Sequence, residues 1–329
     1  MSFASLLRSL ATALLVAGLV LAFTIRVVAR GLPRVVGAPA VAEERECAWP
    51  GTPTLRLRST DGTVRVFSHS GDEVLAEVRI RVYERESDRR EESRSYAEGL
   101  VAVRESEGVL EVTSEPGDRP DFLEVYVDYV LRVPRGTALD IESSNGNVWI
   151  AQGCGGVRVR GGNADIVVTG PSGEVDVETV NGRIRLDDAP EGGRLRTVNG
   201  HIYAHVLGGG LMADTTNGAV VVHLLTPQVD ACELTTRNGG ITVTLQEGCP
   251  VTVDAHAKHG VVRSDFPVDT SQGLQRRRQL RGTIGAGGTR LVLQTLNGNV
   301  WIAKGRPREE RTRTGPLPLQ VLLGGRGVP

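Results

Sequence analysis

Three side chains that could ligate a metal ion recur in the sequence at one constant step. Asp187, His205 and His223 are each 18 residues apart. Two imidazoles and a carboxylate suit zinc or another divalent cation, and equivalent residues of neighbouring strands lie about 4.8 Å apart. The column therefore predicts a metal site if each step carries the chain to the next strand. The alternative is an ordinary polar face near a turn.

A run of arginines forms the second candidate site. Arg276, Arg277, Arg278 and Arg281 could contact an anionic polymer such as teichoic acid, lipopolysaccharide or nucleic acid. The alternatives are a solvated loop and pairing with acidic neighbours such as Asp265. The net charge of the whole chain is only -1, so its overall charge gives no argument for nucleic acid, which is not expected as a partner.

The sequence offers no arrangement typical of an enzyme. Asp187 and Asp188 are adjacent, and adjacent strand residues point to opposite faces, so the two carboxylates do not form an acid and base pair. A Gly-x-Ser-x-Gly motif is absent, and no glycine-rich loop leads from a strand into a helix. We expect a protein without enzymatic activity and without a cofactor.

The candidate residues belong to a repeat that is centred on the dipeptide Asn-Gly. The asparagines of the repeat, the first five 18 residues apart and the last after a further 21, are Asn145, Asn163, Asn181, Asn199, Asn217 and Asn238. On both sides of each asparagine, apolar residues stand two positions apart, which is the period of a strand with one buried face. Each unit therefore predicts a strand, a tight corner and a second strand.

Outward charges indicate how the units are arranged. Five residues before the corner, the sign alternates from unit to unit through Asp140, Arg158, Asp176 and Arg194. Opposite charges stabilise one another only if equivalent strands are direct neighbours, as in a stacked solenoid but not in a meander of hairpins. Because parallel crossovers are strongly right-handed, we predict an all-β, right-handed β-solenoid with coils of about 18 residues. Its open ends need covers.

The N-terminal region predicts a membrane anchor. Residues 9–25 contain no charge and are bounded by Arg8 and Arg26, which is typical of one transmembrane helix. A cleavable signal peptide is the alternative. Arg26, Arg30 and Arg34 follow the span, and by the positive-inside rule they favour a cytoplasmic body.

Composition and pattern divide the chain into five segments. One early coil, with Asp61-Gly62 at its corner, precedes a long insertion. Near the other end, His259-Gly260 stands where the next corner is expected, and the final coil occupies residues 291–302. The predicted segments are an anchor or signal at 1–30, a linker at 31–50, a β segment with the first coil and a cap at 51–136, the solenoid at 137–304 and a disordered tail at 305–329.

Four cysteines give no sign of a metal cluster, because none of them stands in a Cys-x-x-Cys spacing. The four are Cys47, Cys154, Cys232 and Cys249. Cys232 and Cys249 fall in adjacent coils and could come within disulfide reach. The alternative is a set of thiols packed as small apolar side chains.

Several ordered motifs resemble a known family. They are Val-Pro-x-Gly at 133–136, the units Ser/Thr-x-Asn-Gly-x-Ile/Val-x-Ile/Val, and a Gly-Thr-Ile-Gly-Ala-Gly run at 282–287 that leads to Asn297-Gly298. Over about residues 52–304 the chain resembles the bacterial putative-adhesin family of β-strand-repeat proteins. It departs from the pattern at Asn163-Ala164 and at His259-Gly260.

The resemblance implies a β-solenoid domain in bacterial envelope proteins, behind a signal or anchor and without known enzymatic activity. It carries no binding residues over to this chain. We therefore expect a single-pass, membrane-anchored, adhesin-like module whose domain is extracytoplasmic and whose partners are envelope polymers or proteins. The arginine distribution keeps a second hypothesis open, a membrane-tethered regulator or scaffold that faces the cytoplasm. The His column keeps a third open, a metal- or polysaccharide-binding protein.

Overall fold

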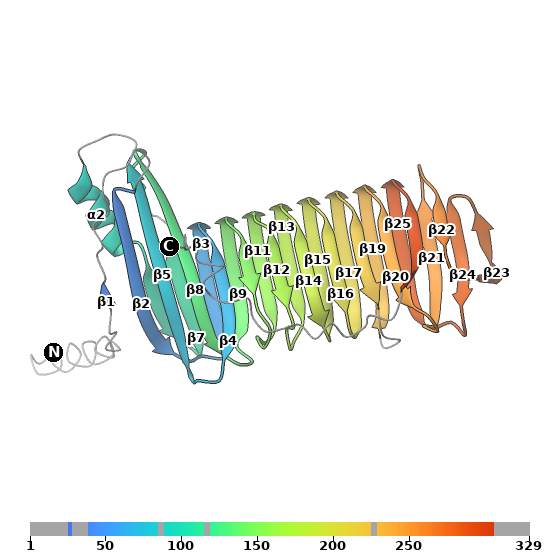
Figure 1. The fold of residues 1–329 in the computed structure, drawn as a ribbon, viewed down its shortest axis with the longest axis horizontal. Helices are drawn as coiled ribbons and strands as arrows, with labels where there is room; N and C mark the ends of the chain where they lie inside the picture. The colour runs from blue at the N-terminus through green and yellow to red at the C-terminus, as the bar shows by residue number, and fades with distance from the viewer. Residues whose placement is uncertain (1–25, 28–38, 85–88, 115–118, 225–228, 306–329) are drawn as a thin grey trace, which may run out of the picture.

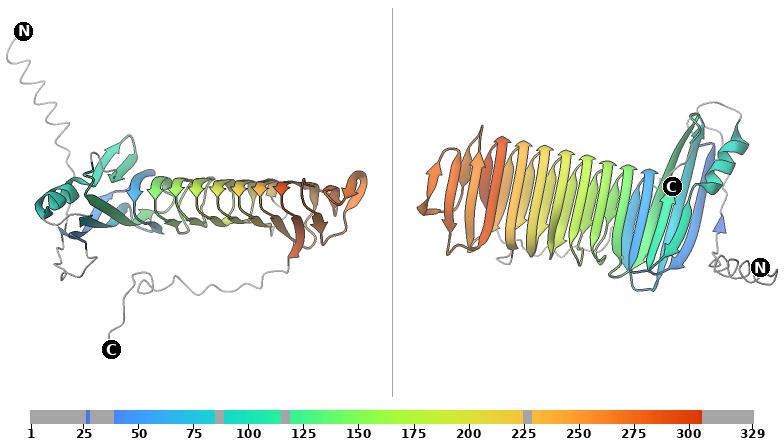
Figure 2. Two further views of the ribbon diagram at one scale, coloured as in Figure 1. Left: turned by 90° about the horizontal axis from the view of Figure 1, so that it is seen from above. Right: turned by 180° about the vertical axis from the view of Figure 1, so that it is seen from behind.

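The described part of the chain is a long stack of β-coils with a broader cap at one end. The computed structural model describes residues 26–27, 39–84, 89–114, 119–224 and 229–305. These residues form two 13-stranded sheets and one helix, α2 (Arg90–Gly99). Figure 1 shows the cap at the N-terminal end, and Figure 2 shows the two sheets from above as facing layers.

Sheet A holds the solenoid strands that follow the corners, together with four strands of the N-terminal region. In spatial order it consists of β1 (Arg26–Val27), β2 (Val41–Pro50), β5 (Glu73–Glu84), β8 (Leu123–Pro134), β4 (Val64–His69), β10 (Val148–Ile150), β12 (Ile166–Thr169), β14 (Ile184–Ala189), β16 (Ile202–Val206), β18 (Val220–Leu224), β20 (Ile241–Gln246), β26 (Val300–Gly305) and β22 (Val262–Ser264).

Sheet B holds the solenoid strands that precede the corners, together with two strands of the insertion and the two of the distal hairpin. In spatial order it consists of β23 (Asp269–Arg276), β24 (Gln279–Ile284), β21 (Val251–Ala257), β25 (Thr289–Asn297), β19 (Val229–Asn238), β17 (Gly209–Asn217), β15 (Gly192–Asn199), β13 (Val175–Asn181), β11 (Val157–Asn163), β9 (Ala138–Asn145), β3 (Thr54–Asp61), β7 (Val109–Ser114) and β6 (Ala102–Ser106).

Equivalent strands of successive coils are direct parallel neighbours. Asp176 stands opposite Arg158 on one side and opposite Arg194 on the other. An ion pair of 3.6 Å joins Arg158 Nε to Asp176 Oδ2. The stacked arrangement that the alternating charges predict is therefore confirmed, and a meander is excluded for these strands.

The core consists of aliphatic columns between the two sheets. In sheet B, Ile141, Val159 and Val177 are fully buried, and in sheet A so are Ile166 and Ile184. Burying each such side chain stabilises the fold by roughly 1.5–3 kcal/mol. A coil has only a few of them, and ordering its backbone costs about 1–2 kcal/mol per residue, so the stack rather than the coil is the folding unit.

The corner asparagines form a hydrogen-bonded ladder along the stack. From Asn163 to Asn297, each Nδ2 donates to the Oδ1 of the preceding corner at 2.7–2.8 Å. At the first corner, Asn145 Nδ2 donates to Asp61 Oδ1 at 3.0 Å. Asp61 suits that position because an ionised carboxylate only accepts hydrogen bonds, and here it needs only to accept one.

The corner at Asn163-Ala164 keeps its place in the ladder although it lacks the usual glycine. Ala164 is buried, and a Cβ added to Gly161 would lie 3.0 Å from the Ala164 Cβ. In the next coil Thr179 occupies the position equivalent to Gly161. A glycine at 161 therefore makes room for the methyl group of Ala164, and the exchange of sizes preserves the corner.

The first coil and the inserted segment form the N-terminal cap. Strands β3 and β4 stack directly on β9 and β10, as the early coil predicts. The insertion then extends both sheets, with β8 beside β4 and β7 beside β3. Residues 41–50, expected to be part of a linker, instead form β2, which pairs antiparallel with β5. This pairing extends sheet A at the cap, and Trp49 of β2 is buried there.

The order of coils at the distal end, opposite the cap, differs from their order along the chain. Strands β25 and β26 lie directly beside β19 and β20, and β21 and β22 lie outside them. The coil expected to be final is therefore the last but one. Asn297 continues the amide ladder in that place, whereas the other coil has His259 at its corner. The hairpin of β23 and β24 then closes sheet B beyond β21.

Two expectations concern residues outside the described part. The predicted transmembrane span at 9–25 and the predicted disordered tail from 306 to 329 both lie there. Among the described residues, no helix has the length and apolar character needed to span a membrane.

Candidate functional site

The expected metal column is interrupted at the coil that contains Asp187. The pairing of β14 with β16 shifts register between Leu186 and Ala189, and Asp188 has a φ of 56°. This irregularity brings Asp188 rather than Asp187 to His205, whose Nδ1 lies 2.6 Å from Asp188 Oδ1. Asp187 Oδ2 instead accepts from Arg185 Nε at 2.7 Å.

The three predicted ligands are thus not assembled as one set. His205 and His223 are register neighbours on β16 and β18, but the Asp187 carboxylate is engaged by an arginine of its own strand. Within the described ranges there is no group of three His, Cys, Asp or Glu side chains placed to hold a metal ion. The dyad of Asp188 and His205 depends on a bulge, which the repeat pattern does not reveal.

The predicted arginine run lies on the hairpin that ends the stack. Arg276 closes β23, and Arg277 and Arg278 form the turn before β24. All three side chains are exposed, and none of them makes an ion pair within the described part of the chain. Arg281 differs, because its Nε donates to Asp254 Oδ1 at 2.9 Å. The structure therefore separates one paired arginine from three that are available.

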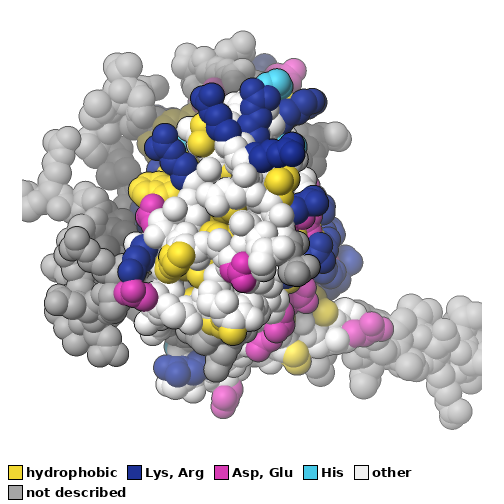
Figure 3. Space-filling view, turned by 90° about the vertical axis from the view of Figure 1, so that its right-hand side faces the viewer, with side chains coloured by type: hydrophobic (Ala, Val, Ile, Leu, Met, Phe, Trp, Pro, Cys, Tyr) yellow, Lys and Arg dark blue, Asp and Glu magenta, His cyan; other side chains and the backbone are white. Residues whose placement is uncertain are grey.

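A lysine outside the predicted arginine run lies beside this turn. The backbone amide of Ala257 donates to the carbonyl of Arg278 at 2.9 Å, so exposed Lys258 follows directly beside the hairpin. We call Lys258, Arg276, Arg277 and Arg278 the distal basic cluster. Figure 3 shows Lys and Arg side chains gathered at one edge of this end face. Only the displaced coil order brings Lys258 to the end, so the sequence spacing gave no signal for it.

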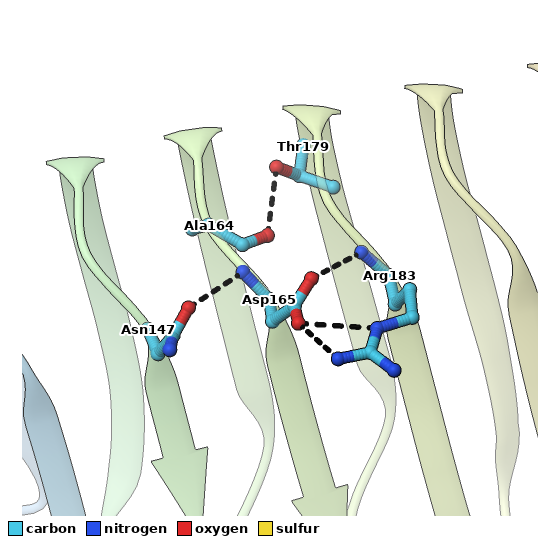
Figure 4. Close-up of polar contacts among 5 residues, drawn as sticks. All are labelled: Asn147, Ala164, Asp165, Thr179 and Arg183. Atoms are coloured by element: carbon cyan, nitrogen blue, oxygen red, sulfur yellow. Dashed lines mark hydrogen bonds and ion pairs between the residues drawn. The ribbon is translucent and has the colours of Figure 1, made fainter.

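A second row of polar side chains lies beside the asparagine ladder. Asn147 Oδ1 accepts from the backbone amide of Asp165 at 3.1 Å, and Asp165 Oδ1 accepts from the amide of Arg183 at 2.7 Å (Figure 4). The Arg183 guanidinium also donates to Asp165 Oδ2 at 2.7 Å. Hydrogen bonding by Arg183 lowers the pKa of the Asp165 carboxyl below its ordinary value. These contacts join successive coils and leave Asp165 engaged by its neighbours.

The cysteines provide neither a disulfide nor an activated nucleophile. All four are described, and no disulfide joins Cys232 to Cys249 or any other two of them. Burial raises the pKa of Cys154 to about 11 and that of Cys232 to about 12. Because the thiolate is the reactive form, these two side chains act as small apolar groups of the core, as the second of the two interpretations predicts.

Three solved structures align with most of this chain but share little of its sequence. A putative adhesin from Bacteroides fragilis is similar over 79% of this chain and 97% of its own, at 8% identity and a TM-score of 0.43. One from Parabacteroides distasonis covers the same shares at 12% identity and a TM-score of 0.39. One from Parabacteroides merdae covers 82% of this chain and 97% of its own, at 11% identity and a TM-score of 0.32. At these TM-scores the likeness adds nothing to the assignment.

The assignment depends on the family model described as Toastrack DUF4097. No curated protein matches the chain. Residues 124–303 match the family model, and this range spans more than half of the 329 residues. It covers the strands from β8 to β26, which include every coil of the solenoid except the first. By this match the chain belongs to the Toastrack DUF4097 family.

Proposed function

We propose that this protein is a non-enzymatic interaction module of the bacterial cell envelope, tethered through its N-terminal segment. In this proposal the distal basic cluster binds an anionic envelope polymer. The observation that carries this proposal is that Arg276, Arg277 and Arg278 are exposed on the hairpin at the end of the stack and make no ion pair among the described residues. Exposed cations without acidic partners attract polyanions.

The shape of the molecule supports this arrangement. Strands β1 and β2 lie at one end of sheet A, and the hairpin of β23 and β24 lies at the opposite end of sheet B (Figure 1). Eight stacked coils separate the cap from the hairpin, which at about 4.8 Å per step corresponds to roughly 40 Å. A chain held at its N-terminus would therefore present the cluster away from its attachment.

The binding proposal is tested by neutralising the turn. The full-length variant Arg276→Gln/Arg277→Gln/Arg278→Gln is compared with Arg94→Gln/Arg104→Gln/Arg135→Gln, which removes three exposed arginines near the cap. With inorganic polyphosphate as the probe, the turn variant should lose on the order of tenfold in affinity, and added salt should weaken the wild type. Equal affinity in the two variants would overturn the role of the cluster.

The location is tested separately by protease accessibility. In intact cells with a permeabilised outer membrane, an extracytoplasmic domain is cleaved by added protease. Full protection would overturn the envelope proposal and favour the cytoplasm-facing scaffold. That second hypothesis has one observation in its favour, the group of Arg26, Arg30 and Arg34 after the apolar stretch.

A further inference from the structure

The outer face of sheet A carries a row of aromatic side chains that the proposed function does not use. The row occupies the fourth position after each corner, between two buried columns, so its side chains point outward. Three of the nine coils of the stack contribute an aromatic residue at this position, namely Trp149, Tyr203 and Trp301. We call these three residues the aromatic row.

The three rings are evenly spaced along the stack. They belong to β10, β16 and β26, which are separated in each case by two intervening strands of sheet A. Three steps of about 4.8 Å place successive rings roughly 14 Å apart. The even spacing exists only because β26 lies directly beside β20. In chain order the coil of Trp301 would stand one step further out.

The rings are available for contact, and two of them are held in place by neighbouring side chains. Tyr203 is 41% exposed and Trp301 is 47% exposed. Trp301 Nε1 donates to Asp265 Oδ1 at 3.0 Å, which fixes the indole while leaving its surface exposed. Trp149 is half-buried and packs edge-on against Phe67, with ring centroids 5.4 Å apart. Orientation by neighbours reduces the entropy that a ligand must overcome to stack on them.

Each ring has an arginine as its direct register neighbour. Arg65 stands beside Trp149, Arg185 beside Tyr203, and Arg263 beside Trp301. Arg185 uses its Nε for Asp187, and its other guanidinium nitrogens are not engaged by that bond. A flat aromatic surface next to a guanidinium provides stacking for a ring and paired hydrogen bonds for a carboxylate.

We infer that the aromatic row binds a linear acidic polysaccharide that runs along the solenoid axis. Sugar rings would lie on the three aromatic side chains, and uronate carboxylates would pair with the adjacent arginines. Single-stranded nucleic acid fits less well, because it requires a continuous basic track. The positions between the arginine and aromatic pairs are instead Val167, Val221 and Thr242. This inference does not depend on the distal basic cluster, because that cluster consists of lysine and arginine side chains only.

The test uses alginate oligomers, a linear polyuronate, with the full-length chain. The variant Tyr203→Ala/Trp301→Ala removes the two most exposed rings of the row. The control Val180→Ala/Val198→Ala removes two apolar side chains that are similarly exposed, at 47% and 43%, and belong to sheet B. We expect the ring variant to lose roughly tenfold or more in affinity for alginate, while the control keeps the affinity of the wild type.

Two further arms separate this inference from the basic-cluster proposal. The ring variant should retain polyphosphate binding, and the Arg276→Gln/Arg277→Gln/Arg278→Gln variant should retain alginate binding. The unfolding temperature of each variant, compared with its control, shows whether the fold is intact. The inference is overturned if the wild type does not bind alginate, or if the folded ring variant binds it as tightly as the control does.

Discussion

The outer faces of the two sheets have the same strand spacing but satisfy their side chains differently. On sheet B, charges of opposite sign face one another across neighbouring strands. Arg56 Nε donates to Asp140 Oδ2 at 3.0 Å, and Arg158 lies 3.6 Å from Asp176. On sheet A, Tyr203 and Trp301 keep much of their surface exposed to solvent. The charged columns of sheet B are matched within the stack, whereas the rings of sheet A leave contacts that the stack does not fill.

This difference shows what a repeated strand can and cannot provide. Neighbouring coils place equivalent residues side by side, so a column that alternates in sign is satisfied by the fold alone. An aromatic residue in every third coil has no equivalent ring within reach of it. The exposed ring faces of sheet A are the surface that we propose for a ligand, whereas the charge pairs of sheet B stabilise the stack.

The largest effect is expected at the corner between β15 of sheet B and β16 of sheet A. A Cβ on Gly200 would lie 1.8 Å from the carbonyl oxygen of Gly182 in the adjacent coil. Gly200→Ala must therefore push two backbones apart and should destabilise the full chain by about 3 kcal/mol, measured by urea unfolding.

The control for this change is Gly210→Ala on β17. Its added Cβ would have its nearest neighbour, the Ala231 oxygen, at 3.7 Å. It should leave stability within about 0.5 kcal/mol of the wild type. Similar destabilisation by the two variants would show that close packing at the corner is not what holds the coils in register.

An intermediate effect is expected when the charge alternation of sheet B is broken. Asp176→Arg would place three arginines side by side, at positions 158, 176 and 194. We expect a loss of about 1 kcal/mol that becomes smaller in high salt, because exposed charges are screened. The measurement is the urea midpoint at low and high sodium chloride.

On sheet A, Val221→Arg is the matched substitution, since its register neighbours Tyr203 and Thr242 carry no charge. It should change stability by less than about 0.5 kcal/mol and should show little salt dependence. If both substitutions had the same salt-dependent effect, the alternating charges of sheet B would not distinguish it from sheet A.

The smallest effect is expected at the corner pair of Asp165 and Arg183. Hydrogen bonding from Arg183 lowers the pKa of Asp165 in the folded state. Its contribution to stability is therefore complete above the unfolded pKa of about 4 and is lost as the pH falls through the lower folded value. Arg183→Leu should raise the folded pKa of Asp165 and reduce this acid dependence. NMR titration of the carboxyl carbon measures the shift, and an unchanged midpoint would contradict the assigned cause.

Much of the repeat could be predicted because its information is local. Spacing alone predicts that equivalent residues stack, namely the corner asparagines, the apolar columns and the alternating charges of Asp140, Arg158 and Asp176. The candidate sites were less accessible to such reasoning. Asp188 replaces Asp187 beside His205 because of a bulge, and Arg281 leaves the basic run because Asp254 lies on the neighbouring strand. A periodic pattern averages over irregularities of this kind.

The sequence by itself determined the stack, because an 18-residue step with apolar residues on alternate positions can bury its core only against copies of itself. Only the tertiary structure decided what lies at the ends. There the last coil along the chain takes the inner place, Asn297 extends the ladder to Asn238, and the coil of His259 is displaced outward. That choice sets both the even spacing of the aromatic row and the position of the basic turn. The order of these coils could not be predicted from the sequence, because β19 pairs with β25, which is distant along the chain, and not with the next coil strand, β21.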